Sequence, residues 1–426
     1  MPRPTIGHRP FGTAPSGDDV DLWRLESRSG VYAEILTYGG ILHSLGVPDT
    51  RGRTDSVVLS LPSLDQYAEK SPYLGALIGR YANRIAHGRF VLDGAAHQVP
   101  VNDRGHALHG GPEGFDTKVW RATPVTDGDT AALRLDLHSP HGDMGFPGAL
   151  DVTATYTLDA AGTLSLECTA TTDRATVVSL SNHAYFNLAA DGDVLGHTLQ
   201  VDGSAYLPVD TEGIPLGPLA EVAGTPFDLT SPRPLGERVP ADGDAQIRRA
   251  GGFDHCWALS GRETGRLRRA ARLAAPAETR VMEVWTTAPG VQVYTANQLD
   301  GSLTDATGRP LERHGAVCLE TQHFPDAPNR ADYPSSVLRP GTTDRRRTEF
   351  RFPHLARGTG DDTGTGDDTG TETTTATLPF GKVLQVAGFR CNVQETTGVS
   401  CGSETSGKGF TFSAEGFTAV YTDVPQ

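Results

Sequence analysis

The sequence predicts an all-β protein, a large antiparallel β-sandwich, from its alternating apolar pattern, its many turn residues and its few helical signals. Apolar and polar side chains alternate over residues 150–158, resume over 164–170 after a turn at Gly162, and alternate again over 132–138. A period of two is typical of strands with one buried and one solvated face. The 426 residues include 50 Gly and 29 Pro, which supply turns between many strands. We therefore expect a sandwich in which 150–158 and 164–170 form a hairpin.

One short helix is expected near the N-terminus. Ser63 is followed three residues later by Gln66, which is the spacing of a capping box at the start of a helix.

The composition changes sharply after Phe352, which predicts a domain boundary. Residues 357–377 contain no large apolar side chain and repeat an Asp-Asp-Thr-Gly pattern, so they cannot bury enough surface to offset the entropy of ordering. A calcium loop would need a bidentate glutamate at its end, which this repeat does not place there. We predict a sandwich domain over residues 1–354, a flexible acidic linker over 355–377 and a small β-rich module over 378–426.

The cysteines indicate two different environments. Cys168, Cys256 and Cys318 are far apart in apolar surroundings, as expected of buried free thiols in a reducing compartment. Cys391 and Cys401 lie in the small module, where a disulfide between them would stabilise a unit too small for a large core. The first group favours the cytoplasm and the second favours export. Since MPRPTIGHRPFG shows no apolar signal segment, we expect a cytoplasmic protein, with export as the alternative.

The charge and hydropathy exclude two classes of function. The net charge is −15, and the basic runs Arg266–Arg272 and Arg345–Arg347 are short, so a nucleic-acid partner is not expected. The longest apolar runs, such as Leu74–Ile78, are far shorter than the ~20 residues of a membrane span.

Polar clusters interrupt the strand pattern where a plain sandwich has no need of them. They are IGRYANRIAHGRF (78–90), HALHGG (106–111), LSNHAYFNL (180–188), GGFDHCWAL (251–259), GVQVYTANQLDG (290–301) and LETQHFPDAPN (319–329). They contribute Arg84, His109, His183, Asp254, Gln292 and Glu320, which together can bind sugar hydroxyls and exchange protons. Phe186 is expected to supply a flat apolar wall for a sugar.

Each of these residues also has a structural interpretation. Taken alone, His183 fits a buried core histidine and Glu320 fits a strand-end carboxylate. His106 and His109 have a spacing that suits metal ligands on a helix. The segment Gly110-Gly111-Pro112 disfavours a helix there, so no metal site is predicted.

The order of these motifs resembles the aldose 1-epimerase (galactose mutarotase) family. The resemblance runs from about Arg9 to Phe352 and rests mainly on GRYANRIA, ALHGG, NHAYFNL and ETQHFPDAPN in sequence. It implies a mutarotase-like supersandwich and an enzyme that interconverts the α and β anomers of free aldohexoses such as galactose or glucose. The family pattern includes no cofactor or metal. We therefore expect a small sugar as the substrate and a monomer or homodimer.

The resemblance also assigns roles to residues. It implies Glu320 as the general base, His183 as the general acid, and Arg84, His109 and Asp254 as ligands of sugar hydroxyls, with Gln292 and Tyr294 close to the sugar. For catalysis Glu320 must be ionised and His183 charged. The expected profile of kcat/KM against pH is thus bell-shaped, with the acid limb from Glu320 and the alkaline limb from His183.

The sequence is compatible with two other functions and departs from the family pattern in places. A hexose-6-phosphate 1-epimerase and a non-catalytic sugar-binding protein are alternatives on the same fold. Cys256 and His87 depart from the family pattern without falling on a catalytic position. The segment after Phe352 has no counterpart in the family, and resembles only a small Cys-pair segment of actinobacterial exported proteins.

Overall fold

The computed structural model describes the backbone of residues 4–239, 243–260 and 265–353, with their side chains except at positions 70, 126 and 127, and the backbone of strands between 383 and 418. The chain divides into two compact units, Met1–Gly360 and Asp361–Gln426. The predicted linker, residues 355–377, lies outside the described residues. The predicted domain boundaries therefore stay a prediction.

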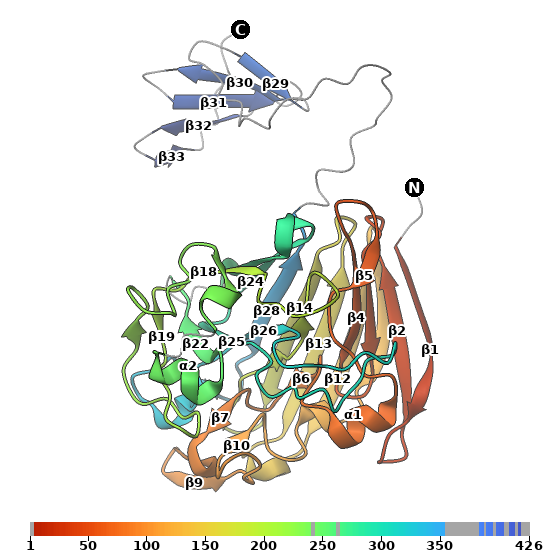
Figure 1. The fold of residues 1–426 in the computed structure, drawn as a ribbon. Coiled ribbons are helices and arrows are strands. Elements are labelled where there is room, and N and C mark those ends of the chain that lie inside the picture. The colour runs from red at the N-terminus through yellow and green to blue at the C-terminus, as the bar shows by residue number, and fades with distance from the viewer. Residues whose placement is uncertain are drawn as a thin grey trace. The chain divides into compact units, whose positions relative to one another are not determined.

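The first unit is built on a nine-stranded antiparallel sheet, whose central strands run side by side in Figure 1. In spatial order its strands are β11 (Arg121–Asp127), β12 (Thr130–Ser139), β13 (Leu150–Leu158), β14 (Leu164–Thr172), β28 (Asp344–Arg351), β24 (Val281–Thr286), β23 (Arg268–Ala274), β18 (Thr198–Val201) and β21 (Arg233–Pro234). The predicted hairpin is confirmed, because Leu150 to Leu158 pair with Thr172 to Leu164 without a register shift.

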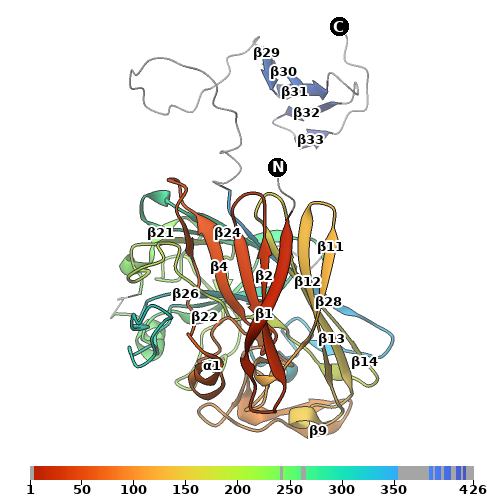
Figure 2. The same cartoon turned by 90° about the vertical axis from the view of Figure 1, so that its right-hand side faces the viewer.

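Two further sheets pack against this one. A five-stranded sheet contains β1 (Thr5–Thr13), β2 (Asp19–Glu26), β3 (Tyr32–Leu36), β4 (Leu42–Pro48) and β5 (Thr54–Ser56). A six-stranded sheet contains β17 (Tyr185–Phe186), β26 (Val317–Gln322), β25 (Gly290–Tyr294), β22 (Asp254–Ala258), β19 (Ala205–Tyr206) and β20 (Ala220–Glu221). Figure 2 shows the five-stranded sheet beside β12 and β13. The fold class predicted from the sequence, an all-β sandwich, is confirmed.

Short pairs of strands and a few helices complete the unit. The pairs are β10 (Ala107–Leu108) with β7 (Arg84–Ile85), β16 (Ser181–Asn182) with β6 (Leu77–Ile78), β15 (Thr176–Val177) with β27 (Val337–Leu338), and β8 (Arg89–Leu92) with β9 (Ala95–Gln98). Within the described residues the α-helices are α1 (Leu64–Lys70) and α2 (Ala245–Ala250), and the other helices are short 3-10 turns. The predicted helix start is confirmed, because the Ser63 side chain caps α1 by accepting a hydrogen bond from the Gln66 N–H; among the described residues the return bond of a full capping box, from the Ser63 N–H to the Gln66 side chain, is not formed. Across the described residues, no helix has the length and apolar character needed to cross a bilayer.

One core fills the space between the sheets. It includes Ile35 and Leu45 of the five-stranded sheet, Leu135 of the nine-stranded sheet, and Val293 and Leu319 of the six-stranded sheet. Since successive side chains of a strand point to opposite faces, the other face of the six-stranded sheet points away from this core.

A buried arginine ties the layers together. Arg280, just before β24, donates hydrogen bonds to the carbonyls of Val47 (2.9 Å), Leu188 (3.0 Å) and Arg53 (2.9 Å), and pairs with Asp55 (2.6 Å). These bonds satisfy carbonyl groups that the packing of the sheets removes from water.

The second unit contains a five-stranded meander of β29 (Val383–Val386), β30 (Phe389–Gln394), β31 (Gly398–Ser403), β32 (Gly409–Ser413) and β33 (Gly416–Thr418). The register of β30 and β31 places Cys391 opposite Cys401. The side chains of both cysteines lie outside the described residues, so their disulfide stays a prediction.

The first prediction concerns the independence of the sandwich. A chain that ends after His354 keeps all strands of the three large sheets, so we expect a thermal unfolding midpoint within a few degrees of the full chain. Its kcat/KM on an aldohexose should stay within about threefold, because every candidate site residue is retained. Calorimetry and polarimetry of the two chains measure this. An insoluble or inactive shortened chain would contradict the predicted boundary.

Candidate active site

The floor of the site is one face of the six-stranded sheet. The register aligns Gln292 with Glu320 and with Cys256, and aligns Tyr294 with Asp254 and with Cys318. Residues that face each other on adjacent strands share one side of a sheet. Glu320, Gln292, Asp254 and Tyr294 therefore form a patch on the side opposite Val293 and Leu319, which point into the core.

His183 reaches this patch from the segment between β16 and β17. Its backbone is held on both sides, because the His183 N–H donates to Ala76 O and the Gly75 N–H donates to His183 O, both at 2.9 Å. These bonds hold the backbone of His183 in place. The adjoining strand β17 pairs with β26 through Tyr185 and Cys318, which places His183 beside the strand of Glu320.

Arg84 and His109 come from the neighbouring pair β7 and β10. The His109 N–H donates to Asn83 O (3.1 Å), and the Asn83 N–H donates to His109 Nδ1 (3.2 Å). Asn83 and His109 both have positive φ (65° and 55°), which turns the chain at the end of each strand. The result is a rigid turn that presents both Arg84 and His109.

The central feature is a buried acid–base pair. His183 Nε2 lies 3.6 Å from Glu320 Oε1, and the side chains are only 6% and 3% exposed. Glu320 Oε2 and His183 Nδ1 have no hydrogen-bond partner among the described residues. A carboxyl and an imidazole at this distance can divide the two proton transfers of one reaction between them.

Burial disfavours the charged form of both groups and therefore shifts their pKa values in opposite directions. It raises the pKa of Glu320 well above its ordinary value, and the nearby Asp254 carboxylate adds to the rise. It lowers the pKa of His183 to about 4. This differs from the expectation of an ionised Glu320 beside a charged His183, because the sequence does not show how completely both groups leave water. In the sugar-free site the neutral carboxyl and neutral imidazole are favoured.

The remaining predicted residues surround this pair. Gln292 Nε2 donates to Asp254 Oδ1 (2.8 Å), while Gln292 Oε1 is buried without a partner among the described residues. The Tyr294 ring meets the His183 ring edge-on at 6.3 Å. Arg84 is buried and its Nε donates to Asp103 Oδ2 (2.8 Å). The residues selected from sequence therefore gather in one place.

The donor set of His109, His183 and Glu320 has the spacing of a cation site, since their ligand atoms lie within 4.8 Å of one another. The tautomer of His109 opposes this interpretation. Because His109 Nδ1 accepts the Asn83 N–H, a neutral ring carries its proton on Nε2. A metal-bound histidine instead donates from its second nitrogen. His109 is therefore built as a hydrogen-bond donor.

The aromatic wall was partly mispredicted. Phe186 points into the core from the opposite face of β17 and packs on Phe350, so it faces away from the site. Its neighbour Tyr185 shares the face of His183 and stacks on that ring at 5.0 Å. The period of two along 183–186 already distinguishes these faces.

Tyr73, which the sequence did not single out, completes the wall. Its ring meets His109 edge-on at 4.5 Å and lies 6.0 Å from His183. Its side chain is half-buried, and its backbone has φ of 63°. No local pattern marks this position.

The two departures from the family pattern differ in their surroundings. Cys256 is a buried thiol opposite Gln292, on the face that carries the site. His87 is at the surface side of this region and its ring lies 5.0 Å from that of His106. Cys256 therefore belongs to the wall of the site, and His87 does not.

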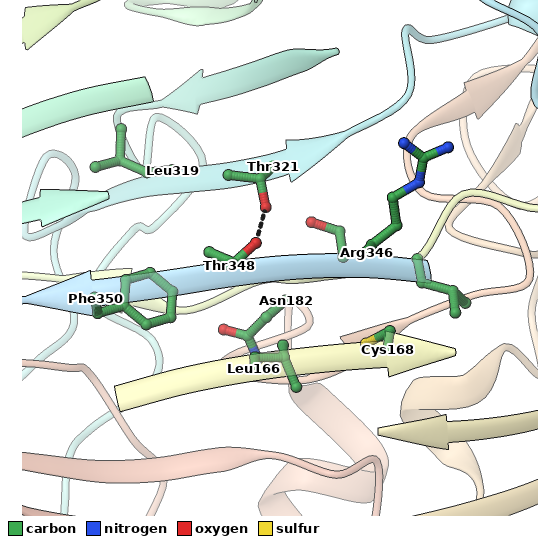
Figure 3. Close-up of a pocket in the computed structure, with 10 residues that line it drawn as sticks. Leu166, Cys168, Asn182, Leu319, Thr321, Arg346, Thr348 and Phe350 are labelled. Atoms are coloured by element: carbon green, nitrogen blue, oxygen red, sulfur yellow. Dashed lines mark hydrogen bonds between the residues drawn. The ribbon is translucent and has the colours of Figure 1, made fainter. Parts of the chain in front are cut away.

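The strand that carries Glu320 is braced from behind. Thr321 points to the core side and its hydroxyl hydrogen-bonds the Thr348 hydroxyl of β28 at 2.5 Å (Figure 3). A cavity of about 10 Å³ lies beside this bond, lined by residues that include Cys168, Asn182 and Arg346. The bond joins the two sheets directly behind the acid–base pair.

Comparison with known proteins places this geometry in a family. The family profile described as Aldose 1-epimerase matches residues 21–351. The chain belongs to the aldose 1-epimerase family. A galactose mutarotase from Rattus norvegicus is 41% identical over 345 residues, which cover 80% of this chain and 97% of the relative. An aldose 1-epimerase from Escherichia coli K12 is 36% identical over 342 residues, with 80% and 97% covered.

Solved structures agree with this membership. A galactose 1-epimerase from Lactobacillus acidophilus has a TM-score of 0.72 at 28% identity and covers 82% of this chain and 98% of its own. An aldose epimerase homologue from C. elegans has a TM-score of 0.70 at 25% identity, with 82% and 99% covered. The family resemblance read from the sequence motifs is confirmed.

A second prediction follows from the buried pair. We expect the His183 ring to be neutral above about pH 4 and the Glu320 carboxyl to keep its proton to a pH well above the range of an ordinary glutamate, because burial disfavours both charges. Imidazole ¹⁵N shifts, assigned by loss of the signal in His183→Asn, measure the first. The carboxyl infrared band, assigned by its loss in Glu320→Gln, measures the second. A charged His183 ring at neutral pH in the sugar-free protein would contradict this.

Proposed function

We propose that the protein interconverts the α and β anomers of a free aldohexose such as galactose or glucose, with Glu320 as the base and His183 as the acid. The observation that carries the proposal is the buried pair of His183 Nε2 and Glu320 Oε1 at 3.6 Å. The family membership supports the same reaction, since curated relatives are named galactose mutarotase and aldose 1-epimerase.

The reaction needs two coupled proton transfers. Glu320 removes the proton from the anomeric O1 while His183 donates one to the ring oxygen O5. The C1–O5 bond then opens to the aldehyde, rotation about C1–C2 presents the other face of the carbonyl, and ring closure reverses both transfers. The enzyme and the sugar thus end with the same protons as at the start.

The surrounding groups suit the hydroxyls of a sugar. Arg84 and the Nε2–H of His109 are donors, while Asp254 and the free Gln292 Oε1 are acceptors. A hydroxyl group both donates and accepts, so a mixed set can orient the ring. Tyr73 and Tyr185 flank the His183 ring and offer apolar surface beside it.

A hexose-6-phosphate substrate has less support. A phosphate group is normally bound by clustered arginines or lysines. Arg84 is the arginine in this set of site residues, and its Nε already donates a hydrogen bond to Asp103, so these residues do not form such a cluster. Polarimetry of freshly dissolved α-galactose, α-glucose and glucose 6-phosphate tests the proposal. Equal optical decay with and without protein for both free sugars would overturn it, and would leave a non-catalytic sugar-binding protein.

The third prediction concerns the catalytic pair. Glu320→Gln should lower kcat by ~10²–10⁴, because the amide cannot accept the O1 proton. His183→Asn should have a similar effect, and the double variant should fall well short of the product because the two groups act as a unit. Arg84→Ala should instead raise KM along with any loss of rate. Steady-state polarimetry with galactose measures all four.

Glu349→Gln is a matched control for this prediction. Glu349 is also a buried glutamate, on β28, but its carboxylate pairs with Arg347 and Arg351 outside the site. It should lose stability and keep kcat within about threefold. If Glu320→Gln kept more than about a tenth of the wild-type kcat, the assignment of the base would be wrong.

The fourth prediction is the dependence of rate on pH. The productive state has one proton on the pair, on His183, and the favoured neutral state also has one proton, on Glu320. Their ratio does not change with pH, so activity falls only when the pair gains a second proton or loses its last one. We expect a bell-shaped kcat/KM profile whose acid limb follows the lowered pKa of His183, about 4, and whose alkaline limb follows the raised pKa of Glu320. Relative to the expectation from sequence, the two limbs are exchanged. A narrow profile between the ordinary pKa values of a glutamate and a histidine would contradict this.

A further inference from the structure

The buried guanidinium of Arg84 is enclosed by two turns that come from distant parts of the chain. Asp103 accepts from its Nε (2.8 Å) and is 23% exposed, whereas the Arg84 side chain is 7% exposed. A Cβ atom on Gly213 would lie 2.8 Å from Arg84 Nη1 and 2.9 Å from Cζ, so the guanidinium lies directly against this glycine. Within the described residues, the structure gives Nη1 and Nη2 of Arg84 no hydrogen-bond partner.

A histidine links the two turns. The chain turns between Asp103 and His106, and the turn is closed by a hydrogen bond from the His106 N–H to Asp103 O at 2.7 Å. His106 Nδ1 accepts the His87 N–H (2.9 Å), so a neutral ring carries its proton on Nε2. That Nε2 lies 3.0 Å from Glu212 Oε2 and can donate to it. His106 is 2% exposed, and Glu212 precedes Gly213.

The turn that carries Glu212 and Gly213 is a defined local structure. Asp210 N donates to Ile214 O (2.9 Å), Gly213 N donates to Asp210 O (3.3 Å), and Asp210 Oδ1 accepts from the N–H groups of Glu212 and Ile214. Gly213 has φ of 87°, which favours glycine. The same backbone bonds recur at Asp49–Arg53, Asp159–Thr163 and Asp305–Arg309.

We propose that the Asp210–Ile214 turn is a positioning element for Arg84, in which Glu212 fastens the turn to His106 and Gly213 forms the wall for the guanidinium. This inference rests on the proposed function. With Nε bonded to Asp103 and one side against Gly213, Arg84 presents Nη1 and Nη2 in a fixed direction for sugar hydroxyls. Glu212 and Gly213 act through Arg84 and do not touch the sugar.

The repeated turn supplies a matched control. Gly308 occupies the same place in its turn as Gly213, with φ of 82°, but a Cβ there would meet no atom within 4 Å. Gly213→Ala and Gly308→Ala therefore introduce the same backbone strain, and only the first presses on Arg84. We expect Gly213→Ala to raise KM for galactose at least about tenfold with kcat within about threefold, because displaced binding groups weaken substrate affinity. Gly308→Ala should leave both constants within about twofold.

A second pair of variants tests the link to His106. Glu212→Ala removes the acceptor and should raise KM about three- to tenfold. Glu212→Gln should restore the wild-type KM, because the amide oxygen can accept from His106 Nε2–H. Equal KM values for Gly213→Ala and Gly308→Ala, or a wild-type KM for Glu212→Ala, would overturn the inference. If Gly213→Ala does not fold, the Glu212 pair decides. A wild-type protein that does not accelerate mutarotation would overturn the proposed function itself, which separates the two failures.

Discussion

The shared register of β22, β25 and β26 is the constraint on which the site depends. Glu320, Gln292 and Asp254 meet because their strands pair without a shift. The apolar side chains on the other face, such as Val293 and Leu319, hold that register by packing into the core. A slip of one residue would send Glu320 into the core and Leu319 into the site. Stability and chemistry are therefore fixed by the same pairing.

Burial explains why Glu320 and His183 favour their uncharged forms. Taking a carboxylate and an imidazolium out of water costs several kcal/mol per ion, and a distance of 3.6 Å without a close hydrogen bond does not recover that cost. The O1 and O5 atoms of a sugar would supply the missing partners. The charged pair is then needed only while the substrate covers it, which suits a neutral substrate.

Local alternation in the sequence was sufficient for the long strands β12, β13 and β14, whereas the choice of the central residues came from the family resemblance. The alternation over 150–158 predicted β13, and the motif around Glu320 and His183 identified a pair that the fold does bring together. Contacts between distant segments carry no such signal. Asp103 with Arg84, and His106 with Glu212, depend on how loops meet in space. The pKa directions depend on burial by the complete fold. Tyr185 and Phe186 are adjacent aromatic residues on opposite faces of β17, so aromatic composition alone does not tell which of them faces the site.

The hydrogen bonds of Arg280 determine how late during synthesis the sandwich can finish folding. The carbonyl of Val47 and the carboxylate of Asp55 belong to strands near the N-terminus, yet their donor lies 233 and 225 residues later. The five-stranded sheet leaves the ribosome long before Arg280 does. Until then its inner carbonyls must stay hydrated, and the apolar side chains around them stay exposed. Contacts between residues so far apart in the sequence favour slow folding, and the nascent sandwich cannot form them until Arg280 and β24 have been translated.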